Sequence, residues 1–120
     1  MKFAGMVRKH IGRGTRLGFP TANLDAPEGI EEGVWLAEVE ANHQTYHSLV
    51  FIGAAETFGE TEKKAEVYLL DFEGPLNGSL LAVTLIKKLR DSKRFDSAEE
   101  LVVQMKDDER MAREYFKSNK

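Results

Sequence analysis

Most of this chain reads as a succession of strand-like segments that no helical pattern interrupts. In each segment apolar residues alternate with polar ones, and turn residues such as Asn42-His43 separate the segments. The predicted strands are Phe3–Lys9, Gly33–Ala41, Gln44–Ile52, Ala65–Phe72 and Ser79–Leu89. Because no helix lies between successive strands, the pattern predicts an antiparallel barrel or sandwich and argues against a parallel sheet.

A helical pattern occurs only at the C-terminal end. Residues Ser97–Glu100 read as a capping box, which marks the start of a helix. Apolar residues then recur at helical spacing, on one stripe that should lie against the barrel: Ala98, Leu101, Met105, Ala112, Tyr115 and Phe116. Asp108 falls in the same stripe, and we expect it to be ion-paired at the edge of the contact between helix and barrel.

Length and composition narrow the class of protein. The 120 residues suffice for one hydrophobic core and not for two, so residues 1–120 are predicted to form a single domain. The chain has no cysteine, which excludes disulfides and thiolate metal sites. A net charge of −3 argues against a nucleic acid partner. Because no apolar run resembles a signal peptide or a membrane span, we expect a cytoplasmic protein with no membrane partner.

Residues 12–24 carry the strongest functional pattern. Glycines at positions 12, 14 and 18 allow the backbone to approach a ligand closely, and Arg13 and Arg16 add charge that suits phosphate oxygens. Thr21 and Asn23 follow a proline, and in an extended segment both would face the same side. Their oxygens are of the kind that Mg²⁺ prefers. The pattern predicts a nucleotide–Mg²⁺ site, and its alternative is a solvated connection followed by a turn.

The run Gly14–Asn23, GTRLGFPTAN, resembles the signature of ATP-dependent riboflavin kinases, which include the kinase module of bifunctional riboflavin kinase/FAD synthetases. Further likenesses follow in the family's order: Gly33-Val34-Trp35, Ile52-Gly53 with Thr57-Phe58-Gly59, Glu66–Phe72, and Leu89-Arg90 with Phe95. Together they cover nearly the whole chain. The resemblance implies a mainly β fold, a six-stranded antiparallel Greek-key barrel with a C-terminal helix packed outside.

The resemblance also implies an activity, the Mg²⁺-dependent transfer of a phosphoryl group from ATP to the 5′-hydroxyl of riboflavin, which gives FMN and ADP. Under this reading Glu66 and Asn23 are catalytic, and Thr21 and Asn23 hold the metal. The residues that would bind the nucleotide are Gly12, Gly14, Thr15, Arg16, Gly18 and Thr21. The residues that would border the flavin are Arg90, Phe58 and Phe95, in the loops 53–64 and 90–96 that we expect to close the pocket.

Several of these residues have structural alternatives. Glu66 could simply end a charged loop, and Arg90 could pair with Asp91 or Asp108. Asp25 is a weaker metal candidate, and we interpret it as a turn acid. Trp35 is expected in the core.

A second function stays open, that of a non-enzymatic small barrel that binds RNA or a protein through the basic loop Arg8–Arg16. The acidic balance of the chain and the scarcity of aromatic residues near that loop favour the enzyme. The expected partners are riboflavin and FMN, ATP and ADP, and a separate FAD synthetase is a further candidate.

Overall fold

The computed structural model describes residues 1–7, 21–54, 63–72, 79–93 and 95–118. These residues form six strands and one long helix. The elements are β1 (Lys2–Met6), β2 (Ala22–Asp25), β3 (Gly33–Ala41), β4 (Gln44–Ala54), β5 (Lys63–Leu69), β6 (Leu80–Arg90) and α2 (Ala98–Ser118). Within these described ranges, no helix is both long and apolar enough to cross a membrane.

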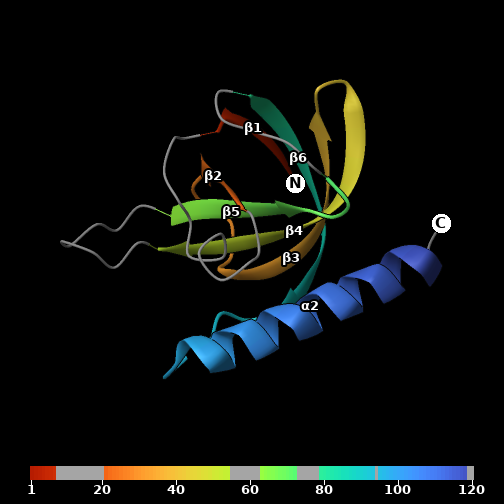
Figure 1. Ribbon diagram of the computed structural model, residues 1–120. Coiled ribbons are helices and arrows are strands. Elements are labelled where there is room, and N and C mark those ends of the chain that lie inside the picture. The colour runs from red at the N-terminus through yellow and green to blue at the C-terminus, as the bar shows by residue number, and fades with distance from the viewer. Residues whose placement is uncertain (8–20, 55–62, 73–78, 94, 119–120) are drawn as a thin grey trace.

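All six strands belong to one antiparallel sheet in the order β1-β6-β3-β4-β5-β2. The sheet curls into a nearly closed barrel, and α2 lies diagonally across its outside (Figure 1). The edge strands β1 and β2 pair with β6 and β5, so the chain crosses between non-consecutive strands. The predicted fold, a mainly β antiparallel barrel of six strands with an external C-terminal helix, is confirmed.

Two strands differ from the sequence pattern. The pattern missed β2, which has only four residues, the first three of them buried. A short strand that is covered on both faces shows no polar–apolar alternation, so its signal is weak. Strand β5 starts and ends earlier than predicted, and a turn follows it in which Asp71 adopts a φ of 61°.

Strands β3 and β4 form the tight hairpin that the sequence predicts. Its two turn residues, Asn42 and His43, both have positive φ, 51° and 66°. This backbone is typical of the type I′ turn, which matches the right-handed twist of the flanking strands. The turn fixes the register of β3 against β4 and thereby of the residues at the far end of the hairpin, where the candidate site lies.

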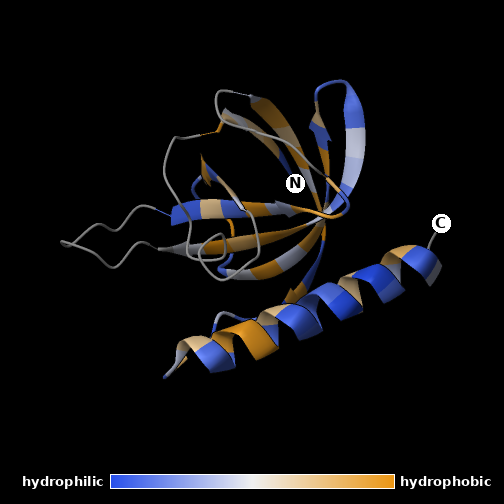
Figure 2. Ribbon diagram, in the orientation of Figure 1, coloured by the Kyte–Doolittle hydropathy of each residue, from blue (hydrophilic) through white to orange (hydrophobic). Residues whose placement is uncertain are grey.

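The strands divide their side chains between the barrel interior and an outer face. In β5, Ala65, Val67 and Leu69 are buried, whereas Glu66 and Tyr68 between them are only half-buried. Figure 2 shows the same alternation of hydrophobic and hydrophilic residues along the barrel strands. Trp35 packs against the interior cluster, as predicted.

Helix α2 covers part of the outer face. A second apolar cluster joins Val34, Leu36, Leu49 and Leu70 of the barrel to Ala112 and Phe116 of the helix. The buried helix residues are Met105, Asp108, Ala112 and Phe116, so most of the predicted stripe is confirmed. The stripe is wrong at Ala98, which is exposed in the first turn of α2. That turn is capped as predicted, since the Glu100 amide donates to Ser97 Oγ at 3.1 Å.

The entry to β3 requires a glycine. Gly33 has a φ of +146°, and a Cβ atom there would lie 2.6 Å from the carbonyl oxygen of Arg90. The neighbouring β3–β6 register shifts between Val34 and Trp35, so the two strands approach each other closely at a bulge. A side chain at this position would push Arg90 out of place.

We expect Gly33→Ala to lower the free energy of unfolding by roughly 2–4 kcal/mol, because it combines an unfavourable φ with a backbone clash. Urea denaturation measures the change. The control is Gly53→Ala in β4, where a Cβ would meet no atom within 4 Å, and there we expect less than about 0.5 kcal/mol. Equal stability of the two variants would contradict the close approach at Gly33.

Candidate functional site

A row of residues crosses the outer face of the sheet from β2 to β6. Asn23 lies directly opposite Glu66, and Glu66 lies opposite Phe51 of β4. Phe51 lies opposite Val34, and Val34 lies opposite Arg90. Opposed residues of an antiparallel pair share one face, with Cβ atoms about 5 Å apart. The fold therefore places Asn23 beside Glu66, and it aligns both with Arg90 on the face that α2 covers.

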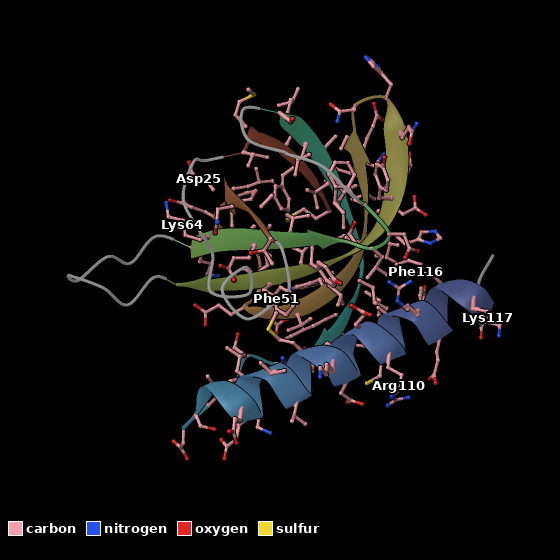
Figure 3. The ribbon with its side chains drawn as sticks, viewed as in Figure 1. Asp25, Phe51, Lys64, Arg110, Phe116 and Lys117 are labelled. Carbon is pink, nitrogen blue, oxygen red and sulfur yellow. The ribbon has the colours of Figure 1, made fainter. Side chains whose placement is uncertain are left out.

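A cavity of about 160 Å³ opens along this row, between the sheet and the start of α2. Its lining comes from four strands, from the segment before the helix and from the helix itself: Gly33, Val34, Phe51, Glu66, Arg90, Ser92, Lys93, Phe95, Leu101 and Met105. Three residues that the sequence nominated separately, Glu66, Arg90 and Phe95, thus border one cavity. Figure 3 shows Phe51 on the side of the sheet that faces α2.

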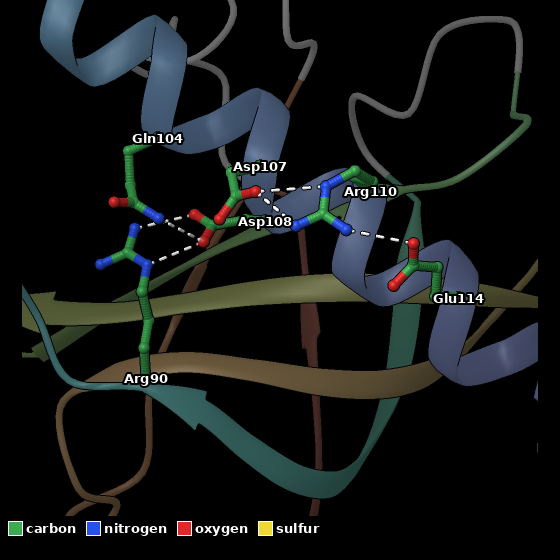
Figure 4. Close-up of polar contacts among 6 residues, drawn as sticks. All are labelled: Arg90, Gln104, Asp107, Asp108, Arg110 and Glu114. Atoms are coloured by element: carbon green, nitrogen blue, oxygen red, sulfur yellow. Dashed lines mark hydrogen bonds and ion pairs between the residues drawn. The ribbon is translucent and has the colours of Figure 1, made fainter.

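Arg90 is held in this wall by an ion pair to the helix. Its Nε and Nη2 donate to the two carboxylate oxygens of Asp108, each at 2.8 Å (Figure 4). Gln104 Nε2 donates to the same carboxylate at 3.0 Å. Of the two partners considered from the sequence, Asp108 forms the side-chain pair, while Asp91 accepts a hydrogen bond from Arg90 only through its backbone carbonyl. The expected ion pair of Asp108 is confirmed.

The carboxylate of Asp91 instead pairs with Lys88, 2.5 Å away. The hydrogen bond from Lys88 lowers the pKa of Asp91, and the same bond raises the pKa of Lys88. Lys88 also contacts Glu31 at 2.6 Å. Both pairs involve Lys88 of β6, so the Asp91 carboxylate does not compete with Asp108 for the Arg90 guanidinium.

The metal candidates lie at the other end of the row. Asn23 is 3% exposed in β2, and Thr21 is half-buried directly before that strand. Among the described residues, no group of three or more acidic or histidine side chains could hold a metal ion. The interpretation of Asp25 as a turn acid is wrong, because Asp25 is the last residue of strand β2. Its carboxylate pairs with Lys64 at 2.9 Å. The candidate protein ligands for a metal ion are the hydroxyl oxygen of Thr21 and the amide oxygen of Asn23.

Tyr68 joins the helix to the strand that carries Glu66. It lies two positions after Glu66 on the same face of β5, and its hydroxyl donates to Glu109 Oε1 at 2.5 Å. Burial, together with the hydrogen bond to Glu109, raises the pKa of Tyr68 to about 12. The phenol therefore stays protonated near neutral pH and continues to donate to the helix.

Part of the predicted site lies outside the described residues. This part comprises Gly12, Gly14, Thr15, Arg16 and Gly18, Phe58, and the basic loop Arg8–Arg16. Their nucleotide-binding and flavin-binding roles stay predictions.

Sequence reasoning missed three residues that line the cavity and one that supports its wall. Phe51, Leu101 and Met105 read as ordinary core residues, and only the strand register and the position of α2 bring them beside Glu66. Gln104 gave no signal at all, because its hydrogen bond to Asp108 depends on where the helix docks. Asp108 did give one, as an acid within an apolar stripe.

Comparison with known proteins places this chain in a family. The family model described as "Flavokinase: Riboflavin kinase" matches residues 1–116. An RNA-binding riboflavin kinase, RibR, of Bacillus subtilis is 39% identical over 107 residues, which are 88% of this chain and 46% of that protein. A bifunctional riboflavin kinase/FMN adenylyltransferase of Escherichia coli K12 is 36% identical over 106 residues, 86% of this chain and 34% of that protein.

Two solved structures share the fold. A riboflavin kinase from Trypanosoma brucei superimposes with a TM-score of 0.65 at 21% identity, over 97% of this chain and 79% of that one. A Streptococcus pneumoniae structure titled as a macrolide-efflux protein gives 0.83 at 35% identity, over 93% of this chain and 38% of that one. The chain spans less than half the length of the curated relatives described above. On the match over residues 1–116, the chain belongs to the riboflavin kinase family.

Proposed function

We propose that this chain phosphorylates riboflavin, with ATP as the phosphoryl donor and FMN and ADP as the products. Membership of the riboflavin kinase family supports the proposal. The observation that carries it is the register of β2 against β5, which sets Asn23 directly opposite Glu66. Glu66 in turn borders a cavity that Arg90 and Phe95 also line.

Phosphoryl transfer requires positioned phosphates, an aligned hydroxyl and a group that accepts its proton. In the proposed step, the 5′-hydroxyl oxygen of riboflavin forms a bond to the γ-phosphorus of ATP. The bond from that phosphorus to the β,γ-bridging oxygen breaks, and ADP leaves with the electron pair. The carboxylate of Glu66 accepts the hydroxyl proton. Its position on the cavity wall suits this role, since the acceptor would lie beside it.

Thr21 and Asn23 would hold a Mg²⁺ ion together with phosphate oxygens of the nucleotide. The donor set fits, because both residues offer hard neutral oxygens and Mg²⁺ completes its shell from phosphates and water. The burial of Asn23 means that its amide is held in place before a ligand arrives. When bound, the ion neutralises charge on the phosphates. The phosphates themselves would contact the glycine-rich segment 12–18.

The flavin ring would lie against Phe95 and Phe51, with Arg90 at its polar edge. Aromatic walls with a few polar groups are typical of sites for planar ligands. The cavity volume of about 160 Å³ is below the roughly 300 Å³ at which small-molecule sites begin. We therefore propose that the cavity-lining residues Ser92, Lys93 and Phe95 move outward from α2 when riboflavin enters.

The experiment that tests the activity combines the protein with riboflavin, ATP and Mg²⁺ and separates the flavins by chromatography. We expect FMN and ADP in equal amounts, and no FMN when EDTA removes the metal. Failure to form FMN from any nucleoside triphosphate would contradict the proposal.

RNA binding is named for one relative, of which this chain spans 46%. We propose the kinase and not RNA binding for this chain, whose net charge is −3. A gel-shift titration with RNA tests the alternative, and a shift that persists at physiological salt would favour it.

A further inference from the structure

Asp108 is the one acidic or basic side chain that is buried among the described residues, with 0% exposure. It lies in the middle of α2 and faces the barrel, where it accepts hydrogen bonds from Arg90 and Gln104 (Figure 4). Buried ion pairs contribute little net stability, because the loss of hydration offsets the attraction between the charges. An apolar pair of similar size would join the helix to the sheet equally well, so stability alone does not account for this pair.

The geometry of Arg90 suggests what the pair does. A guanidinium has five N–H donors in a fixed plane. One on Nε and one on Nη2 bind Asp108, and one on Nη1 binds the backbone carbonyl of Asp91. Two donors remain, one on each terminal nitrogen. The side chain lines the cavity that Glu66 and Phe95 also border, so its donors can serve a ligand held there.

We propose that Asp108 is a positioning residue, which fixes the guanidinium of Arg90 so that its two remaining donors bind carbonyl oxygens on the edge of the flavin ring. The inference rests on the proposed function for the identity of the ligand. A free arginine side chain has many rotamers and would lose that freedom on binding. Asp108 restricts Arg90 in advance, which lowers the cost of binding the ring.

The pair also links the two parts of the site. Arg90 ends the strand that pairs with β3, and Asp108 belongs to the helix that covers the cavity. If the helix shifts, the hydrogen-bonding edge that meets the flavin shifts with it. Riboflavin affinity is therefore expected to depend on Asp108, whereas ATP affinity, which depends on the far end of the row, is not.

The test measures the riboflavin Kd by quenching of its fluorescence, and the KM values for riboflavin and ATP in the kinase assay. We expect Asp108→Asn to raise the riboflavin Kd roughly tenfold, the scale of a lost charge-assisted hydrogen bond, because an amide offers only one acceptor oxygen to the arginine fork. The KM for ATP should stay within about threefold of the wild-type value. This is well below the roughly tenfold change that the loss of one hydrogen bond would cause. The control is Asp107→Asn, which removes the exposed pair to Arg110 from the adjacent position of the helix. It should leave both constants unchanged.

A double-mutant cycle separates positioning from folding. If Asp108 acts through Arg90, then Arg90→Met and the double variant Arg90→Met/Asp108→Leu should have the same riboflavin Kd. The double variant buries no charge and is expected to remain folded by circular dichroism. Should Asp108→Asn fail to fold, Gln104→Leu provides the milder change: it removes one hydrogen bond to Asp108, and we expect a riboflavin Kd about threefold higher, less than a full bond's effect.

A wild-type riboflavin Kd in folded Asp108→Asn, or in Gln104→Leu where the former is unfolded, would overturn the inference. It would leave the proposed function intact if FMN still forms. If the wild-type chain binds riboflavin without forming FMN, the proposed function fails and the Kd values still decide the inference. If the wild-type chain does not bind riboflavin, both fail.

Discussion

Glu66→Gln is expected to lower the kcat for FMN formation by roughly 100-fold or more, which is the scale of losing a general base. The amide keeps the size of the side chain and cannot accept the proton of the 5′-hydroxyl. Because Glu66 is half-buried on the outer face of β5, the substitution should not disturb the barrel interior. The KM values for riboflavin and ATP should change little, since the interaction that is lost belongs to the transition state.

Glu38→Gln is the matched control for this experiment. Glu38 also lies within a barrel strand, but its side chain is exposed and does not border the cavity. Its kcat should equal that of the wild type. A Glu66→Gln enzyme that turns over at a near wild-type rate would remove Glu66 from the mechanism and would favour its reading as the end of a charged loop.

Thr21→Ala and Asn23→Ala are each expected to weaken Mg·ATP binding and turnover together, by roughly tenfold or more for the loss of one ligand to a shared ion. If both side chains hold the same ion, their losses should not add in the double variant. Titration of FMN formation with Mg²⁺ at fixed ATP measures the effect, and the midpoint should move to higher concentration.

Both substitutions remove polar groups from covered positions, so stability must be followed separately. Ser48→Ala provides the comparison, because Ser48 is fully buried and lies away from the site. Its hydroxyl donates to the Tyr46 carbonyl at a distance of 3.1 Å. We expect it to lose about 1 kcal/mol of stability with no change in the Mg²⁺ midpoint. Additive losses at Thr21 and Asn23 with an unchanged midpoint would favour a structural role for both residues.

The barrel could be predicted from the sequence because its long strands alternate. In β5, Ala65, Val67 and Leu69 face the interior while Glu66 and Tyr68 do not, and this contrast is visible in the residue order. The same reasoning failed for β2, where burial on both faces removes the alternation. The missed strand is also the one that carries Asn23, so the pattern alone could not place that residue opposite Glu66.

Residues of the candidate site could be nominated from the sequence, whereas their arrangement could not. The resemblance nominated Glu66, Arg90 and Phe95 from distant parts of the chain, and the structure brings all three to one cavity. What the sequence could not supply is register and docking. Residues that face one another across strands, such as Glu66 and Phe51, are related by the pairing of whole strands and not by spacing.

For Asp108, the sequence predicted an ion pair but did not identify its partner. An acid within an apolar helical stripe predicts an ion pair, because an unpaired carboxylate is costly to bury. The sequence left its partner open, and the end of β6 supplies Arg90. Ala98 shows the opposite error: it satisfies the helical spacing, but its side chain is exposed in the first turn of α2.

We propose that the cavity between Glu66 and α2 receives the riboflavin whose hydroxyl is phosphorylated. A crystal structure with riboflavin and Mg·ADP tests it most directly. We expect the ring to lie against Phe95 and Phe51, with its carbonyl edge on Arg90. The 5′-hydroxyl should lie about 2.6–3.2 Å from the Glu66 carboxylate. Riboflavin bound elsewhere on the barrel, or a hydroxyl out of reach of Glu66 in that complex, would contradict it.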